Sequence, residues 1–137
     1  MKPAALIALL AVSASPLVAQ KREAIGQSSP TLTPAIRVGN MVYASGQLGN
    51  TSDTTIAGQT RTALERTKAV FEQAGAKMEN AVKCTVFLTD VRDFRAMNTA
   101  YSAFWASNPP ARSTVVVAAL VVPTAKIEIE CIAAIVS

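Results

Sequence analysis

The sequence contains no histidine, and this absence excludes much of common enzyme chemistry. Without an imidazole there is no Ser-His-Asp or Cys-His triad, and the usual imidazole-ligated metal centres are excluded as well. The chain also lacks a Gly-rich loop of the kind that holds nucleotide phosphates. We therefore expect no metal and no cofactor, so that any catalysis depends on carboxylates, arginine, hydroxyl groups, backbone groups and water.

Charged residues and cysteines are also scarce. Only 16% of the 137 residues are charged, and 13 basic against 9 acidic residues give a net charge of +4. The basic residues are scattered, which argues against nucleic acid as a partner. The two cysteines, Cys84 and Cys131, lie in strand-like segments with apolar neighbours, and no CxxC motif is present. We expect two buried free thiols, although an oxidising compartment would permit a disulfide between them.

The amino terminus has the features of a secretory signal peptide. Lys2 provides a positive charge, residues 4–14 form a short apolar run, and Ala19 precedes a polar segment. The run is shorter than the ~20 residues that a membrane-spanning helix needs. We therefore expect residues 1–19 to be a cleaved signal peptide and residues 20–137 to form one periplasmic or secreted domain with no membrane contact. A retained anchor or an uncleaved tail is the competing interpretation.

Hydrophobic periodicity predicts the element order β-β-α-β-α-β-β after an extended arm at residues 20–34. The expected elements are strands at 35–38 and 41–45, a helix at 58–74, a strand at 81–88, a helix from 89–90 to 108, and strands at 113–120 and 126–136. Asp90 is a candidate cap of the second helix, whose apolar stripe is Phe94, Met97, Tyr101, Phe104 and Trp105. Two one-sided helices and long β-branched strands indicate an α+β fold with both helices on one face of a sheet.

Strand alternation assigns residues to the two faces of that sheet. Val82, Cys84, Val86 and Leu88 share one face, as do Ile127, Ile129 and Cys131. Glu128 and Glu130 then lie on the opposite face. Val116 and Ile132 indicate that this second face is not wholly polar, which is common where an oligomer hides it. A carboxylate enclosed in such an interface is suited to proton transfer, and the alternative is an ordinary solvated pair.

Two further segments contain candidate ligand-binding groups. Arg112 follows Pro109-Pro110, so that its guanidinium starts a strand from a stiff loop and could clamp a carboxylate with two hydrogen bonds. An ordinary surface arginine beside a turn is the alternative. At the end of the predicted hairpin, the hydroxyl of Ser45 and the unobstructed backbone of Gly46 could face a small ligand.

These segments, in this order, resemble the RidA/YjgF family of enamine and imine deaminases. The resemblance runs from about Pro34 to Val136. It is carried by residues 38–47, 86–90, 93–94, 98, 101, 110–113 and 127–130.

The resemblance implies a chorismate-mutase-like fold, a homotrimer with a barrel-like centre, and active sites between subunits. It implies that Arg112 binds a substrate carboxylate and that Glu128 positions water and shuttles a proton. Ser45 and Gly46 would line the pocket, with Thr114 and Asn98 as weaker candidates for contact or support. The reaction would be the hydrolysis of 2-imino acids or their enamine tautomers, such as 2-aminoacrylate, to 2-keto acids and ammonia.

The sequence departs from the family pattern in three respects. Leu32 or a neighbour stands where members often have a tyrosine, which affects one wall of the pocket. Val121 and Val122 lengthen the turn before the last strand. The family is usually cytoplasmic, whereas this chain begins with a predicted signal peptide.

Three other functions fit the sequence less well. The chain could bind small carboxylates or keto acids without turnover, or could be a chaperone-like protein that uses exposed apolar surface. Ribonuclease activity has been attributed to the family, but the lack of histidine and of a basic aromatic groove ranks it last.

Overall fold

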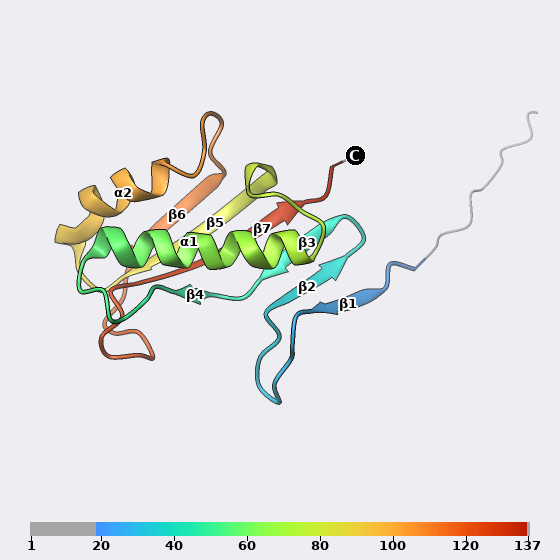
Figure 1. Cartoon of the computed structure of the whole chain (residues 1–137), viewed down its shortest axis with the longest axis horizontal. Helices are drawn as coiled ribbons and strands as arrows, with labels where there is room; N and C mark the ends of the chain where they lie inside the picture. Colours follow the sequence, from blue (N-terminus) through green and yellow to red (C-terminus); the bar gives the residue numbers. More distant parts are fainter. Residues whose placement is uncertain (1–18, 137) are drawn as a thin grey trace, which may run out of the picture.

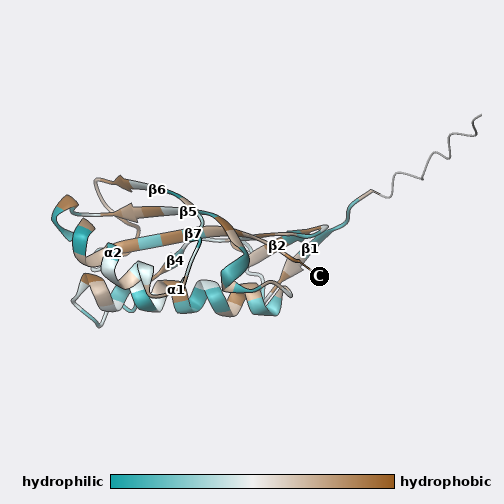
Figure 2. Cartoon of the chain, turned by 90° about the horizontal axis from the view of Figure 1, so that it is seen from above, coloured by the Kyte–Doolittle hydropathy of each residue, from teal (hydrophilic) through white to brown (hydrophobic). Residues whose placement is uncertain are grey.

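The computed structural model describes residues 19–136 as a mixed sheet with two helices on one face (Figure 1 and Figure 2). The predicted signal peptide, residues 1–19, lies outside the described residues except for Ala19. Within 19–136 no helix is both long enough and apolar enough to cross a membrane. The arrangement confirms the predicted α+β fold.

Seven strands, two α-helices and two 3-10 turns make up the domain. In chain order they are β1 (Arg22–Ile25), β2 (Ala35–Val38), β3 (Met41–Ala44), β4 (Gln47–Leu48), α1 (Ile56–Gln73), η1 (Met78–Asn80), β5 (Ala81–Leu88), η2 (Val91–Asp93), α2 (Phe94–Ser102), β6 (Ala111–Val116) and β7 (Ile127–Ala134). The strand order is β1-β2-β3-β7-β5-β6, and β4 also pairs with β7. Strands β5 and β6 are parallel, so the chain crosses over through α2 between them.

Local sequence explains the hairpin and the long helix. The β2–β3 hairpin turns at Gly39, whose φ of +59° is easily reached only without a side chain. Helix α1 begins where the Thr55 hydroxyl accepts the Gly58 N–H at 3.1 Å, and it ends before Gly75 at a φ of +84°. The buried side of α1 includes Leu64 and Phe71, as the periodicity predicted.

Several element boundaries differ from the prediction. Residues 22–25 form strand β1 against β2 within the segment expected only to be an extended arm. The second helix begins later, because Asp90 caps the 3-10 turn η2 by accepting the Arg92 N–H at 2.8 Å. Phe94 is 43% exposed and does not join the buried stripe. Strand β6 ends at Val116 because its neighbour β5 ends at the paired residue Leu88.

Val82 was assigned to the wrong face. The β5–β7 register shifts between Ala81 and Lys83, so a bulge turns Val82 outward, where it is 44% exposed. Ala81 is buried instead. A bulge adds one residue and reverses the alternation on one side of it, which a strict period of two cannot reproduce.

The prediction of two free thiols was also wrong. Cys84 and Cys131 form a disulfide that joins β5 to β7 beneath the helices. The two residues are direct partners in the antiparallel register, with Cα atoms 4.1 Å apart. Both segments were identified as strands, but neither the pairing of these strands nor their register followed from the sequence.

Candidate active site

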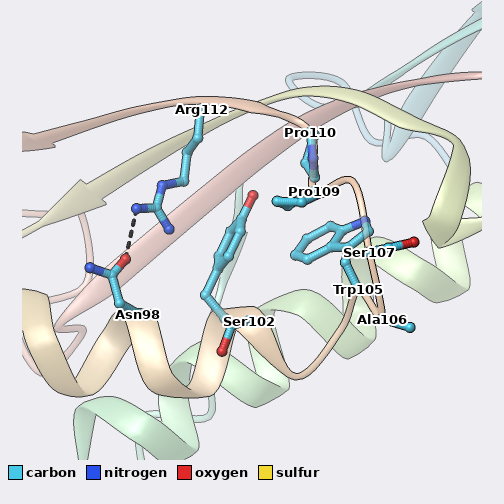
Figure 3. Close-up of a pocket in the computed structure, with 9 residues that line it drawn as sticks. Asn98, Ser102, Trp105, Ala106, Ser107, Pro109, Pro110 and Arg112 are labelled. Carbon is cyan, nitrogen blue, oxygen red and sulfur yellow. Dashed lines mark hydrogen bonds between the residues drawn. The ribbon is translucent and has the colours of Figure 1, made fainter.

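Arg112 lies at the start of the edge strand β6 and points toward helix α2. Its Nη2 donates a 2.7 Å hydrogen bond to Oδ1 of Asn98, and its Cζ lies 4.6 Å from the centre of the Tyr101 ring (Figure 3). Asn98 and Tyr101 are three residues apart on α2 and therefore share one face of the helix. The guanidinium is held by an amide and an aromatic ring, and within residues 19–136 its other N–H groups make no hydrogen bond, so they can bind an anion.

A pocket of about 640 Å³ adjoins this arginine. Its walls come from α2, the loop after it and the start of β6: Asn98, Tyr101, Ser102, Trp105, Ala106, Ser107, Pro109, Pro110 and Arg112. Burial raises the pKa of Tyr101 to about 12, and the nearby Arg112 charge only partly opposes the effect. The phenol is therefore neutral at ordinary pH and can donate a hydrogen bond.

Two hydroxyl groups on this side of the sheet have no hydrogen-bond partner although both are buried. They are the Tyr101 hydroxyl and Oγ1 of Thr114. Thr114 follows Arg112 by two residues on β6, so both side chains project to the helix-covered side. Arg112, Asn98 and Thr114 thus lie in one region, and Tyr101 joins them.

Glu128 occupies a different place, on the face of the sheet that no helix covers. It pairs with Phe87 of β5 on one side and with Leu48 of β4 on the other. A side chain at Gly46 would collide with the Glu128 carboxylate, so this glycine gives the carboxylate its space. Ser45 is adjacent, and its Oγ donates to the Thr33 carbonyl at 2.7 Å, which leaves its lone pairs available.

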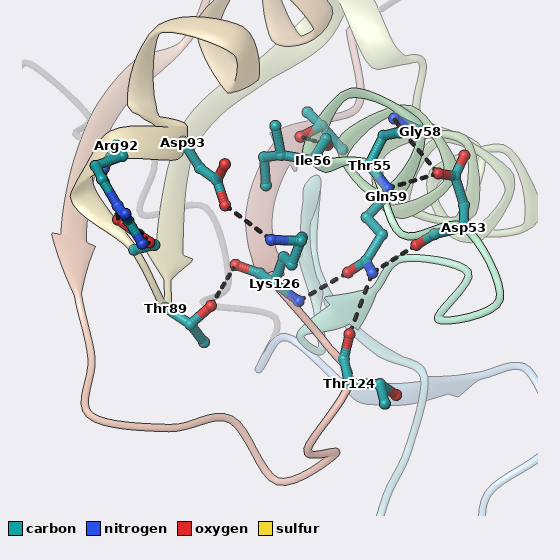
Figure 4. Close-up of polar contacts among 12 residues, drawn as sticks. Asp53, Thr55, Ile56, Gly58, Gln59, Thr89, Arg92, Asp93, Thr124 and Lys126 are labelled. Carbon is teal, nitrogen blue, oxygen red and sulfur yellow. Dashed lines mark hydrogen bonds and ion pairs between the residues drawn. The ribbon is translucent and has the colours of Figure 1, made fainter.

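Gln59 of α1 fixes the start of β7 and hence the position of Glu128 (Figure 4). Its Oε1 accepts the Lys126 N–H at 2.8 Å, and its Nε2 donates to the carbonyls of Thr124 at 3.2 Å and Asp53 at 2.8 Å. In the turn before β7, Val121 is 89% exposed. The Gln59 hydrogen bonds therefore tie the base of this turn to α1.

The two predicted catalytic side chains do not meet within one chain. Arg112 pairs laterally with the buried Cys84 and so belongs to the helix-covered side. Glu128 pairs with Phe87, one residue before the buried Leu88, and so belongs to the open face. They are also two strands apart, on β6 and β7. Within one copy, the two side chains therefore lie in separate regions.

The open face carries apolar side chains, as expected, but not all of those predicted. Ile132 lies on it opposite Tyr43, which is 46% exposed. Val116 was assigned to the wrong side, since its partner is Leu88 of the helix-covered row, and Val115 lies on the open face instead. Lys83 donates to Oγ of Ser113 at 2.7 Å on the same face. In the described part of the chain, no group of three or more acidic or thiol side chains could hold a metal.

Sequence reasoning overlooked three residues of this region. Tyr101 and Trp105 were assigned only to core packing, and both are buried, yet both also line the pocket. Gln59 received no role, although a buried amide on an apolar helix face is a signal for a hydrogen-bonded anchor. Leu32, at the position discussed for the family tyrosine, lies exposed in the segment between β1 and β2.

Comparison with known proteins identifies the family. The family described as Endoribonuclease L-PSP matches residues 23–135, nearly all of the described domain. The chain therefore belongs to the RidA/YjgF/L-PSP family, as the resemblance indicated.

Several named members of the family are similar to this chain in sequence or structure. The chain is 42% identical over 106 residues to the Escherichia coli protein named 2-iminobutanoate/2-iminopropanoate deaminase, covering 72% of this chain and 82% of the relative. It is 37% identical to the Arabidopsis thaliana Reactive Intermediate Deaminase A, chloroplastic, covering 92% and 71%. The crystal structure of RidA from the Antarctic bacterium Psychrobacter sp. PAMC 21119 superimposes with a TM-score of 0.75 at 36% identity, covering 82% and 99%.

Proposed function

We propose that the protein hydrolyses 2-imino acids and their enamine tautomers to 2-keto acids and ammonia. The observation that carries the proposal is the Arg112–Asn98 pair, an oriented cation at the mouth of a pocket. Relatives named as deaminases of such imines support the same reaction. An imine carbon already accepts nucleophiles, so the reaction needs positioned water and proton transfer but no covalent intermediate.

In this proposal Arg112 binds the substrate carboxylate through two parallel hydrogen bonds. Glu128 orients the attacking water, takes its proton and returns a proton to the departing nitrogen. Ser45 and the backbone at Gly46 line the same half-site as Glu128, and Thr114 supports the Arg112 half-site. General acid-base help of this kind typically contributes ~10²–10⁴-fold.

We further propose that the active site forms between copies of the chain in a homotrimer. The separation of Arg112 and Glu128 on opposite faces supports this, because one copy would supply the carboxylate clamp and its neighbour the base. The apolar residues on the open face, among them Tyr43, Val115 and Ile132, support an interface there. Enclosure between subunits would also exclude bulk water from the reacting carbon.

A complementation experiment tests both parts of the proposal. The imine is generated in situ with an amino-acid oxidase, and the imine that remains is trapped with semicarbazide. Arg112→Ala and Glu128→Gln homotrimers are each expected to lose at least 100-fold in rate. Trimers refolded from an equal mixture should recover about a quarter of wild-type activity, because about one site in four then draws both intact residues from different copies.

Two results would contradict this proposal in different ways. Mixed trimers that stay inactive would exclude a shared site. The second result is a wild-type protein that does not accelerate imine decay above the rate in buffer but binds keto acids saturably. This result would indicate a non-catalytic binding module. The replacement of the family tyrosine near the exposed Leu32 favours that second candidate.

We also propose that the mature domain works outside the cytoplasm. A buried disulfide is stable in oxidising compartments and rare in the cytosol, which agrees with the predicted export signal. The relatives named as mitochondrial or chloroplastic are also directed out of the cytosol. Mass spectrometry of the native protein tests this: a chain beginning near Gln20 supports cleavage after export, and an intact Met1 in the cytosolic fraction excludes it.

A further inference from the structure

The pocket beside Arg112 is much larger than the smallest substrates of the proposed reaction. Small-molecule sites commonly enclose ~300–1,000 Å³, and this pocket has about 640 Å³. An imino acid of three carbons occupies only a small part of such a space. The remaining volume leaves room for a longer side chain.

Polar and aromatic groups are separated along the pocket (Figure 3). The Arg112 guanidinium and the Asn98 amide form one end. Tyr101 lies next, 4.6 Å from the guanidinium, and the centre of the Trp105 ring is 4.7 Å further on from the Tyr101 ring. Pro109 and Pro110 also line the pocket. A ligand with its carboxylate on Arg112 would therefore direct its side chain along aromatic and apolar walls.

These walls are rigid. The indole Nε1 of Trp105 donates to the Met78 carbonyl at 3.1 Å, which fixes the ring, and the two prolines restrict the loop backbone. A preformed pocket binds without a large ordering cost, so its shape can select between substrates. Such walls also do not close around a small ligand, so a small ligand would leave part of the pocket unfilled.

The Tyr101 hydroxyl, next to the pocket, has no hydrogen-bond partner within residues 19–136. Its oxygen is buried and makes no hydrogen bond, while its residue lines the pocket. Buried hydroxyl groups in folded proteins nearly always have a partner. The phenol therefore keeps an unused hydrogen-bonding group beside the pocket.

We propose that this pocket receives the substrate side chain and selects 2-imino acids with bulky, aromatic side chains over those with a methyl group. The inference rests on the proposed deaminase function and specifies its substrate class. Arg112 binds the carboxylate, and Trp105 with Pro109 and Pro110 contacts the aromatic ring. Stacking on aromatic walls and burial of apolar surface supply the discrimination.

Binding of stable keto acids tests the pocket without requiring turnover. Phenylpyruvate and pyruvate are titrated into purified wild-type protein by calorimetry, and phenylpyruvate is expected to bind about tenfold more tightly. Ala106→Phe adds bulk to the pocket wall at an exposed position. It should weaken the binding of phenylpyruvate about tenfold and change the affinity for pyruvate by no more than about twofold. Ala103→Phe is the matched control, since Ala103 is exposed nearby but does not line this pocket.

The outcomes separate this inference from the proposed function. Equal affinity for the two keto acids, or an Ala106→Phe variant that binds phenylpyruvate as well as the control does, overturns the inference. The same proteins are then assayed with imines made from phenylalanine and alanine. Selective binding without hydrolysis of either imine supports the pocket and rejects the deaminase, whereas hydrolysis with no preference for the aromatic imine rejects the pocket alone.

Discussion

The two faces of the sheet differ in what covers them and in what they contain. Under α1 and α2 the strands present a continuous buried row that includes Val86, Leu88 and Ile129, and the disulfide lies within it. No helix within residues 19–136 covers the opposite face (Figure 2), on which Tyr43 and Val115 are 46% and 44% exposed. One face contains the buried core, and the other is the face on which we propose that a second copy packs.

The residues proposed for the site follow the same division. Arg112 and Asn98 lie at the margin of the helix-covered side, while Glu128 lies on the open face beside Gly46. A residue on the covered side is held by the fold of one chain. In the proposed trimer, a residue on the open face reaches its final surroundings only when a second copy covers it. The comparison teaches that folding of one copy and completion of the proposed site are separate events, which mutations should separate.

The largest expected effect comes from opening a cavity on the covered side. Leu64→Ala removes a fully buried side chain of α1 and should lower the free energy of unfolding by about 3 kcal/mol, measured by urea denaturation at fixed protein concentration. The oligomeric state should not change. Val115→Asp, on the open face, should leave the circular dichroism spectrum native but dissociate the proposed trimer in sedimentation experiments. A Val115→Asp protein that stays trimeric would place the interface elsewhere.

Loss of the disulfide should have the next largest effect. Cys84→Ala with Cys131→Ala should cost about 2–4 kcal/mol, because the crosslink joins residues 47 apart in sequence and restricts the unfolded chain. Reductant should lower the urea midpoint of the wild type toward that of the double variant and leave the double variant unchanged. Two free thiols titrated in the denatured, unreduced protein would show that the bond does not form.

The covered side could largely be predicted from the sequence. Helix α1 was expected from its apolar stripe, and the turn at Gly39 from its residue pair, because both depend on neighbours close in the chain. Errors arose where the outcome depends on pairing between distant strands. The bulge at Val82, the end of β6 at Val116 and the disulfide are all set by the register of β5 with its neighbours.

The candidate site was predictable only in part for the same reason. Residue type and resemblance selected Arg112 and Glu128. Alternation divides the residues of one strand between two faces, but it does not say which of the two faces packs against the helices. Their separation became clear only from the register. Tyr101 was assigned to the core correctly, and its second role as a pocket wall depends on the conformation of the loop that follows α2.

The smallest expected effect concerns the two tyrosines, one on each side of the sheet. Burial raises the pKa of Tyr101 to about 12 in the folded chain, against about 10 when unfolded. Between these values the unfolded chain releases the phenolic proton first, so stability should fall as pH rises from 10 to 12, by about 1 kcal/mol at pH 11. Tyr101→Phe should remove this component of the pH dependence in urea denaturation, and Tyr43→Phe on the open face is the matched control. If both variants changed the pH dependence of stability equally, the covered side would not shield Tyr101 from water. The two faces would then not differ at this wall of the proposed pocket.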